Sequence, residues 1–221
     1  YHPHDWRGWW AFGTGSLGDM ACHTANLAFM SLKLGLPHRV SAVSGEVNPE
    51  TYPAWATITY EFGQRDQMPP VRFTWYEGAK DGQRNLPDAD LLHGQEIPAS
   101  GMLFVGDEGS ILTPDDYGAK QVLLPVEKFQ DFERPAPTLR RLGEGNNDDN
   151  HKREWIRAIQ GGPPTMSNFD YAATMTEAML LGNVAVRTGK ALEYDGAKGK
   201  VTNCREAAQH VDSGHRAGWE V

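Results

Sequence analysis

An aspartate and a histidine, Asp19 and His23, stand four residues apart in a segment with helical periodicity. On an α-helix this spacing puts both side chains on one face, about 40° apart at roughly 100° per residue. A carboxylate beside an imidazole can orient the ring, raise its pKa and let it exchange a proton near neutral pH. The pair therefore indicates acid/base chemistry. The alternative is that Asp19 complements the positive end of the helix and His23 is an ordinary surface histidine.

The segment that carries the pair has the pattern of one long helix from Leu17 to Leu34. Gly35 and Pro37 follow it, as is typical where a helix ends. Asn26 and Met30 continue the face of the acid/base pair. A neighbouring, mainly apolar stripe is expected to pack on a sheet and consists of Met20, Thr24, Leu27, Ser31 and Leu34.

A glycine-rich turn precedes this helix. Gly13, Gly15 and Gly18 match the G-x-G-x-x-G pattern of a dinucleotide-binding turn. Asp19 follows the third glycine directly, so a carboxylate would stand in the helix turn that must face a pyrophosphate. The remaining chain also lacks the alternating strands and helices of a nucleotide-binding domain. We therefore interpret the glycines as a turn that allows close backbone approach.

The elements that must position this helix are mostly short strands. Their short links favour antiparallel neighbours. Two more helices are expected at His151–Gln160 and Tyr171–Arg187, the second capped by Asn168 or Asp170 and ended by Gly189. Together they predict an α+β fold, with a large mixed, mainly antiparallel β-sheet and helices packed on one face. The expected strands are Arg39–Val47, Trp55–Phe62, Val71–Tyr76, Met102–Val105, Ser110–Leu112, Gln121–Leu124 and Ala191–Tyr194.

The composition narrows the class of partner. The chain has 221 residues, a net charge of -8 and 39% hydrophobic residues, enough for a real core. An acidic chain offers no basic surface for phosphates, so we expect no nucleic acid and no anionic membrane as partner. No apolar run approaches the roughly 20 residues that span a bilayer. Cys22 and Cys204 are too few for a disulfide framework and are expected to be free thiols.

A metal site is not expected. His2, His4 and Asp5 are close in sequence, but they lie beside Pro3 in a loop, and no second cluster has ligand spacing. We therefore predict no metal in this chain.

The stretch from Trp6 to His23 combines a Trp-Arg pair, a glycine-rich turn and the pattern D-x-x-x-H. It closely resembles the segment that opens the C-terminal domain of Gfo/Idh/MocA oxidoreductases, and in particular a bacterial branch that is often exported. The resemblance covers nearly the whole chain and continues through Asn48–Trp55, Val71–Tyr76, Gly101–Gly106, Ser167–Tyr171 and Gly189–Leu192.

The resemblance implies that residues 1–221 form one substrate-binding and oligomerisation domain. The N-terminal dinucleotide-binding domain, with the family's catalytic lysine in a Glu-Lys-Pro motif, is expected to lie outside this chain. NAD or NADP would be bound mainly by that missing domain, and none is expected in this fragment, which by itself should be inactive. The substrate would be a sugar, a sugar derivative or a cyclic polyol that loses a hydride from a hydroxyl-bearing carbon.

The resemblance also implies roles for individual residues. Asp19 and His23 would serve the proton transfer that accompanies hydride movement. Trp6 and Arg7 would reach the cofactor, since a guanidinium suits a pyrophosphate or carboxamide oxygen. Their alternative role is aromatic packing and a surface ion pair.

The substrate itself is expected to contact Asn26, Trp9 and Trp10. Aromatic faces suit the C–H surfaces of a sugar ring, although such residues more often belong to a core or an interface.

Three further expectations follow from the resemblance. The alternatives to an oxidoreductase are an NAD-dependent glycosidase of the same superfamily and a non-enzymatic carbohydrate-binding or dimerisation module. We expect a homodimer or homotetramer through a sheet face on which Trp55, Thr57 and Thr59 alternate to one side. The compartment stays open between cytoplasm and periplasm, with twin-arginine export compatible with the resemblance.

Overall fold

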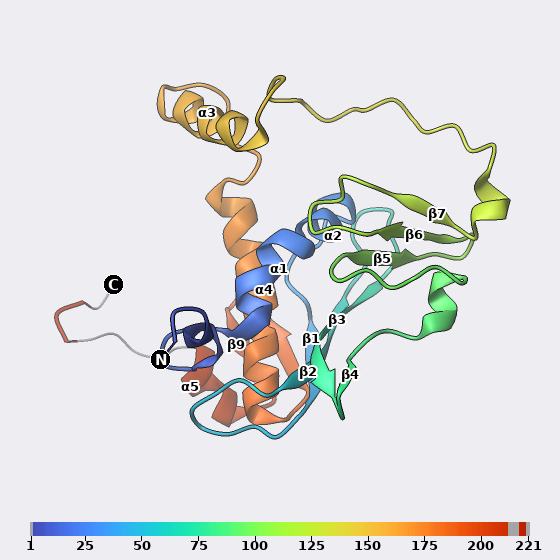
Figure 1. The fold of residues 1–221 in the computed structure, drawn as a ribbon. Helices are drawn as coiled ribbons and strands as arrows, with labels where there is room; N and C mark the ends of the chain where they lie inside the picture. Colours follow the sequence, from blue (N-terminus) through green and yellow to red (C-terminus); the bar gives the residue numbers. More distant parts are fainter. Residues whose placement is uncertain (1, 212–216, 220–221) are drawn as a thin grey trace.

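The computed structural model describes residues 2–211 and 217–219. Six strands form one sheet in the order β4-β3-β2-β1-β8-β9, and all its neighbouring pairs described here are antiparallel (Figure 1). The predicted α+β fold with a mainly antiparallel sheet is confirmed. The strands are β1 (Arg39–Ser44), β2 (Trp55–Phe62), β3 (Val71–Lys80), β4 (Gln83–Arg84), β8 (Leu192–Asp195) and β9 (Lys200–Val201).

A second, smaller sheet lies beside the first, which corrects the expectation of one sheet. It contains β5 (Met102–Val105), β6 (Ser110–Thr113) and β7 (Val122–Leu124), which pair only with one another among the described strands. The reason is packing, because Leu92, Leu112 and Leu124 form a small core of their own.

Two helices cover one face of the large sheet. Helix α4 (Phe169–Thr188) contacts β1 and β2, and helix α1 (Gly15–Thr24) contacts both α4 and β3 (Figure 1). Asn168 caps α4 by accepting the Tyr171 N–H at 3.2 Å, and Gly189 ends it at a φ of 61°. The predicted cap and stop of this helix are therefore confirmed.

The expected single helix from Leu17 to Leu34 is two helices. Helix α1 ends at Thr24, and α2 (Asn26–Ser31) follows after Ala25, whose ψ of -13° departs from helical geometry. The predicted buried stripe is correct only in part, since Thr24 and Leu34 are buried, whereas Met20 and Leu27 are half-buried and Ser31 is exposed. The other buried residues of this segment are Leu17, Ala21, Ala25, Ala28 and Phe29. Small side chains let α1 approach α4 and the sheet closely.

The side chains of strand β2 show which face of the large sheet is buried and which is open. Its side chains alternate between half-exposed and buried along its whole length, as a period of two requires. Tyr60 points to the core, where its hydroxyl donates to the Met179 carbonyl of α4 at 2.8 Å. Trp55, Thr57 and Thr59 are half-exposed on the other face, where Val43 of β1 is also exposed.

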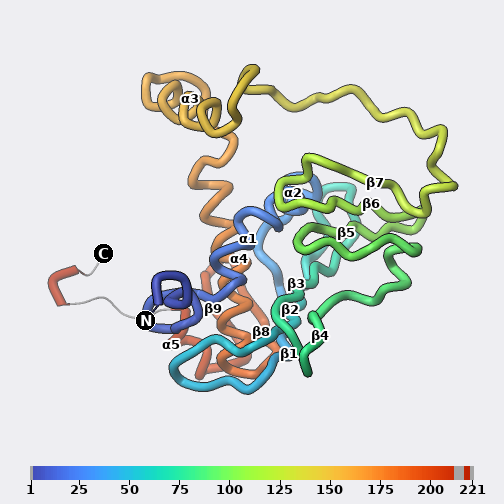
Figure 2. The backbone as a smooth tube through the Cα atoms, in the orientation of Figure 1, coloured from blue at the N-terminus to red at the C-terminus, as the bar shows by residue number. Residues whose placement is uncertain are grey.

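Helix α3 (Asn147–Ile159) begins earlier than expected, because Asn146 accepts the N–H groups of Asp148 and Asp149. A long segment carries the chain from the small sheet to this helix (Figure 2). The buried side chains of α3 are polar, whereas its apolar stripe is exposed at Trp155, Ile156 and Ile159. The remaining short helices are η1 (Asp5–Gly8), η2 (Ala89–Leu92), η3 (Val126–Phe129), η4 (Arg205–Ala207) and α5 (Ala208–Val211).

We predict that Gly182→Ala destabilises the fold. A Cβ at Gly182 would lie 2.8 Å from Leu17 and 3.1 Å from Ile58. Overpacking of this kind costs about 2 kcal/mol, more than the roughly 1 kcal/mol that alanine gains over glycine in a helix. Urea unfolding followed by circular dichroism measures the difference. Gly35→Ala is the control, because a Cβ there meets nothing within 4 Å; equal midpoints for both variants would contradict the packing described.

Candidate functional site

The predicted acid/base pair lies exposed on α1. Asp19 Oδ2 accepts a hydrogen bond from Arg7 Nε at 3.1 Å, and the two side chains are 43% and 35% exposed. His23 lies one turn further along the same helix and is also exposed. No hydrogen bond of standard geometry joins Asp19 to His23, both of which the structure describes. In this structure the Asp19 carboxylate therefore orients the Arg7 guanidinium and not the His23 ring.

Arg7 connects η1 to α1. Besides Asp19, it donates from Nη1 to the His4 carbonyl at 3.3 Å, and its guanidinium carbon lies 4.9 Å from the centre of the Trp6 ring. A cation over an aromatic face is attracted by the ring quadrupole. The surface ion pair and aromatic packing weighed for these two residues are therefore present, and their contact with a cofactor stays a prediction.

His23 meets an aromatic residue from the small sheet. The ring centres of His23 and Tyr117 are 5.6 Å apart, at an interplanar angle of 85°. Tyr117 belongs to the loop between β6 and β7. Three segments distant in sequence thus contribute to one continuous surface, which we call the α1 strip: Trp6, Arg7, Asp19, His23 and Tyr117.

The two tryptophans expected to contact substrate, Trp9 and Trp10, follow Trp6 and Arg7 closely in sequence. Trp10 Nε1 donates to the Asn48 carbonyl at 3.2 Å, and the Trp10 ring lies 4.9 Å from Tyr52 and 4.8 Å from the Arg187 guanidinium. Trp9 is half-buried and forms a β-bridge with Thr51. The structure favours a structural role for Trp10, and substrate contact by either residue stays a prediction.

Asn26 lies at the start of α2, where it binds α4. The Tyr171 hydroxyl donates to Asn26 Oδ1 at 2.7 Å, and burial raises the pKa of Tyr171. This bond uses the side-chain oxygen of Asn26. Contact between Asn26 and a substrate stays a prediction, with the amide nitrogen as the group to make it.

A buried carboxylate on β3 supports the start of α1. Glu77 is only 9% exposed, and its Oε2 accepts the Trp75 indole N–H at 2.8 Å. Burial raises the pKa of Glu77, while the Trp75, Tyr52 and Ser16 side chains and the Leu17 backbone N–H lower it to a smaller extent.

This carboxylate lies beside the first turn of α1. Thr14, the residue before α1, makes no capping bond with its side chain. The first N–H groups of a helix lack intrahelical partners, and a carboxylate there also complements the helix dipole. Glu77 faces this first turn, although its Oε1 and the Tyr52 hydroxyl make no hydrogen bond of standard geometry with the described residues.

The glycine turn is filled by the protein's own atoms. A Cβ at Gly13 would collide with the Arg7 carbonyl, and one at Gly15, where φ is 69°, with the Tyr52 ring. These contacts explain the two glycines without a ligand. The antiparallel sheet likewise contains no parallel pair among the described strands, so the turn opens no βαβ unit.

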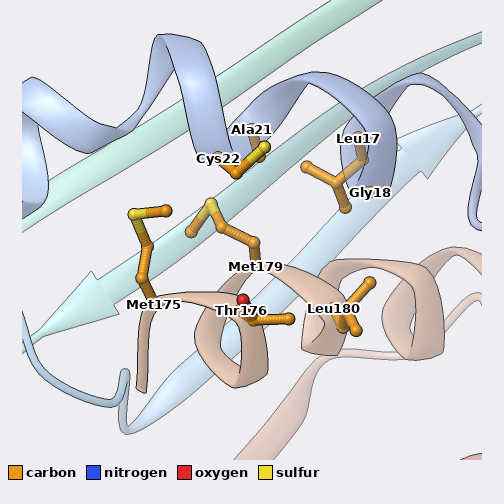
Figure 3. Close-up of a pocket in the computed structure, with 8 residues that line it drawn as sticks. All are labelled: Leu17, Gly18, Ala21, Cys22, Met175, Thr176, Met179 and Leu180. Atoms are coloured by element: carbon orange, nitrogen blue, oxygen red, sulfur yellow. The ribbon is translucent and has the colours of Figure 1, made fainter. Parts of the chain in front are cut away.

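An apolar pocket lies on the neighbouring side of α1, away from Asp19 and His23. It is formed between α1 and α4, with the sulfur atoms of Met175 and Met179 pointing from α4 toward α1 (Figure 3). It has little polar lining and bears no acid or base, so it does not extend the chemistry of the α1 strip. Cys22 and Cys204 are both free thiols.

Residues 2–211 and 217–219 contain neither a cluster of metal ligands nor a helix suited to cross a membrane. No three His, Cys, Asp or Glu side chains there group as metal ligands, and His2 contacts Asp5 only at 4.0 Å. No helix in the described part of the chain has the length and apolar character to cross a membrane.

Sequence reasoning missed Tyr117 and Glu77. The run Pro114 to Gly118 has the composition of a turn, and its Asp115, two residues before Tyr117, is a signal for a turn that fixes its neighbours. Nothing in the sequence links Tyr117 to His23, which lies 94 positions earlier in the chain. Glu77 follows a strand pattern, and only its burial marks it as special.

We predict that Glu77 makes the fold less stable as pH rises. Because burial raises the pKa of Glu77, the folded state holds its proton more tightly than the unfolded state. The stabilisation is complete below the unfolded pKa of about 4.3 and is lost as pH rises through the folded pKa. Glu77→Gln removes this titration, so its stability relative to the original protein should increase as pH rises above the unfolded pKa of about 4.3. Urea unfolding at several pH values tests this, and a pH-independent difference would refute it.

Comparisons with known proteins leave the family open. No protein-family model matches this chain, and no curated protein does. Its function must therefore be argued from the α1 strip and the surfaces around it.

Proposed function

We propose that this chain is the substrate-side domain of an NAD(P)-dependent oxidoreductase that acts on a hydroxyl of a sugar, a sugar derivative or a cyclic polyol. The observation that carries the proposal is the α1 strip. It combines an exposed imidazole, a carboxylate one helical turn away and a guanidinium beside it, next to an exposed aromatic ring. These groups suit an uncharged polyhydroxy ring better than a peptide or a nucleic acid.

The chemistry asked of the chain is proton transfer. Oxidation of a secondary alcohol removes a hydride from carbon and a proton from oxygen, and leaves a carbonyl. The bound cofactor would supply the hydride acceptor. His23 accepts the hydroxyl proton through a ring nitrogen, and it returns the proton in the reverse direction. In the chain by itself the Asp19 carboxylate is bound to Arg7. When Arg7 binds another anion, the Asp19 carboxylate is released and can pair with the His23 imidazole.

The described residues do not form a complete cofactor site. The glycine turn is occupied by Arg7 and Tyr52, so it offers no cradle for a pyrophosphate. The dinucleotide would be held by a separate domain, with Trp6 and Arg7 as contacts from this side. Nothing in this arrangement selects NAD over NADP.

The exposure of the α1 strip favours a second domain that covers it in the active enzyme. Acid/base and hydride chemistry proceed best where water is excluded, yet Asp19 and His23 lie on an open helix surface. A dinucleotide-binding domain over the strip would close the site and bring the cofactor to it. It would also give Arg7 an anionic partner in place of Asp19.

The open face of the large sheet supports self-association. Val43, Trp55 and Tyr76 lie on this face, opposite the helices, together with Thr57 and Thr59. A flat, partly apolar face of this kind suits a symmetric contact between copies, and we propose a homodimer or homotetramer through it.

We predict that His23→Ala in the natural protein lowers turnover with its best sugar or cyclic polyol by about 10²- to 10⁴-fold, the usual contribution of a general base. Asp19→Asn should lower turnover less, because Asp19 only supports the His23 ring and does not itself accept the proton. Absorbance of the reduced cofactor measures turnover. His38→Ala is the control, since this histidine, which directly precedes β1, is also exposed but pairs with Glu61 of β2.

Other outcomes distinguish the alternatives. Glycoside cleavage without net formation of reduced cofactor would replace the proposal with a cofactor-recycling glycosidase. Sugar binding without any turnover in the original protein, or turnover unaffected by His23→Ala, would show that the pair has no catalytic role and that the domain serves binding alone.

A further inference from the structure

Tyr117 is an exposed aromatic residue on a loop that is fixed in place. Its side chain is 72% exposed, among the highest values for large hydrophobic residues here. Exposed aromatic residues on mobile loops carry little meaning, but a rigidly presented ring is a feature of binding surfaces. The contacts of the loop therefore decide whether Tyr117 has a function.

The carboxylate of Asp115 fixes the loop from within. Its Oδ1 accepts the N–H groups of Tyr117 at 2.8 Å and Ala119 at 3.0 Å, and its Oδ2 accepts that of Lys120 at 3.0 Å. These backbone hydrogen bonds lower the pKa of Asp115. One side chain thus organises the backbone on both sides of Tyr117.

Two further contacts hold the loop against the helices. Asp116 Oδ1 accepts hydrogen bonds from Thr24 at the end of α1, at 2.8 Å, and from Ser100. Gly118, at a φ of 67°, packs so closely on Leu27 of α2 that a Cβ would collide with it. The loop is therefore anchored to the element that carries His23.

The result is a fixed phenol ring beside an imidazole. The two ring centres are 5.6 Å apart and the rings are nearly perpendicular, so a ligand resting on an open face of Tyr117 would lie close to His23. Because the loop is already ordered, a ligand does not have to restrict it on binding.

We propose that Tyr117 is a stacking platform for the C–H face of a neutral pyranose or cyclic polyol ring, and that this stacking selects which hydroxyl reaches His23. The proposal rests on the proposed function, since it places the substrate on the same strip. It also names a substrate class. The loop of Tyr117 carries the carboxylates of Asp115 and Asp116, and in the chain by itself Arg7 is paired with Asp19, so we expect uronates and sugar phosphates to bind this chain more weakly than neutral rings.

An NMR titration of the chain that observes both the ligand and the ring signals of His23 tests the platform. The probes are myo-inositol and methyl α-D-glucopyranoside as neutral rings, D-glucuronate as an anionic ring, and glycerol as a polyol without a ring. We expect the neutral rings to bind and the anionic ring and glycerol to bind more weakly. Tyr117→Ala should weaken binding of the neutral rings by about 10-fold, as expected for loss of an aromatic contact, and Tyr117→Phe by less than about 2-fold.

Matched controls separate this effect from a loss of folding. Tyr76→Ala removes another exposed tyrosine, on the opposite face of the sheet, and should leave ring binding unchanged. Truncation of so exposed a side chain as Tyr117 should also leave the thermal unfolding midpoint of the chain nearly unchanged.

The ring signals of His23 distinguish the two proposals. If a neutral ring shifts the His23 signals and Tyr117→Ala weakens its binding, both proposals are supported. If the ring shifts His23 but Tyr117→Ala binds it equally well, the platform is overturned and the proposed function stands. If no neutral ring binds, or if binding leaves the His23 signals unmoved, the platform is overturned, whereas the proposed function is decided separately by the turnover of His23→Ala.

Discussion

The close packing of α1 between α4 and the large sheet is the constraint on which the site depends. Small residues permit it, since the buried side of α1 consists of Gly15, Leu17, Ala21 and Thr24, and Gly182 of α4 leaves room for Leu17 and Tyr60. Glu77 completes it by placing a carboxylate against the first turn of a helix whose own Thr14 provides no side-chain cap. A helix held at its start and along one side presents its opposite face, with Asp19 and His23, in one fixed direction.

The α1 strip is assembled from three regions by tertiary contacts. The 3-10 helix η1 supplies Arg7, which pairs with Asp19, and the small sheet supplies Tyr117, whose loop bonds to Thr24 through Asp116. The small sheet therefore does more than extend the fold, because it builds the edge of the site at which a ligand would rest. The deeper apolar pocket beside Cys22 lies apart from these groups and has no acid or base of its own.

Local patterns predicted the fold well where one physical effect dominates. Strict alternation along β2 gave its bounds, and Asn168 and Gly189 gave the ends of α4. Patterns failed where tertiary packing decides, as at Ala25, where one expected helix becomes two. The site was predictable only as far as local spacing reaches. Asp19 and His23 share a face, as four-residue spacing requires, but Arg7 and Tyr117 join them through contacts that sequence order does not encode.

The central claim is that the α1 strip is the substrate surface, and a crystal structure of the natural protein with a bound cyclic polyol tests it most directly. The account predicts one hydroxyl of the polyol within hydrogen-bonding distance of a His23 ring nitrogen and the ring face against Tyr117. A polyol bound instead on the open face of the sheet or in the apolar pocket, with His23 in contact with solvent alone, would contradict it.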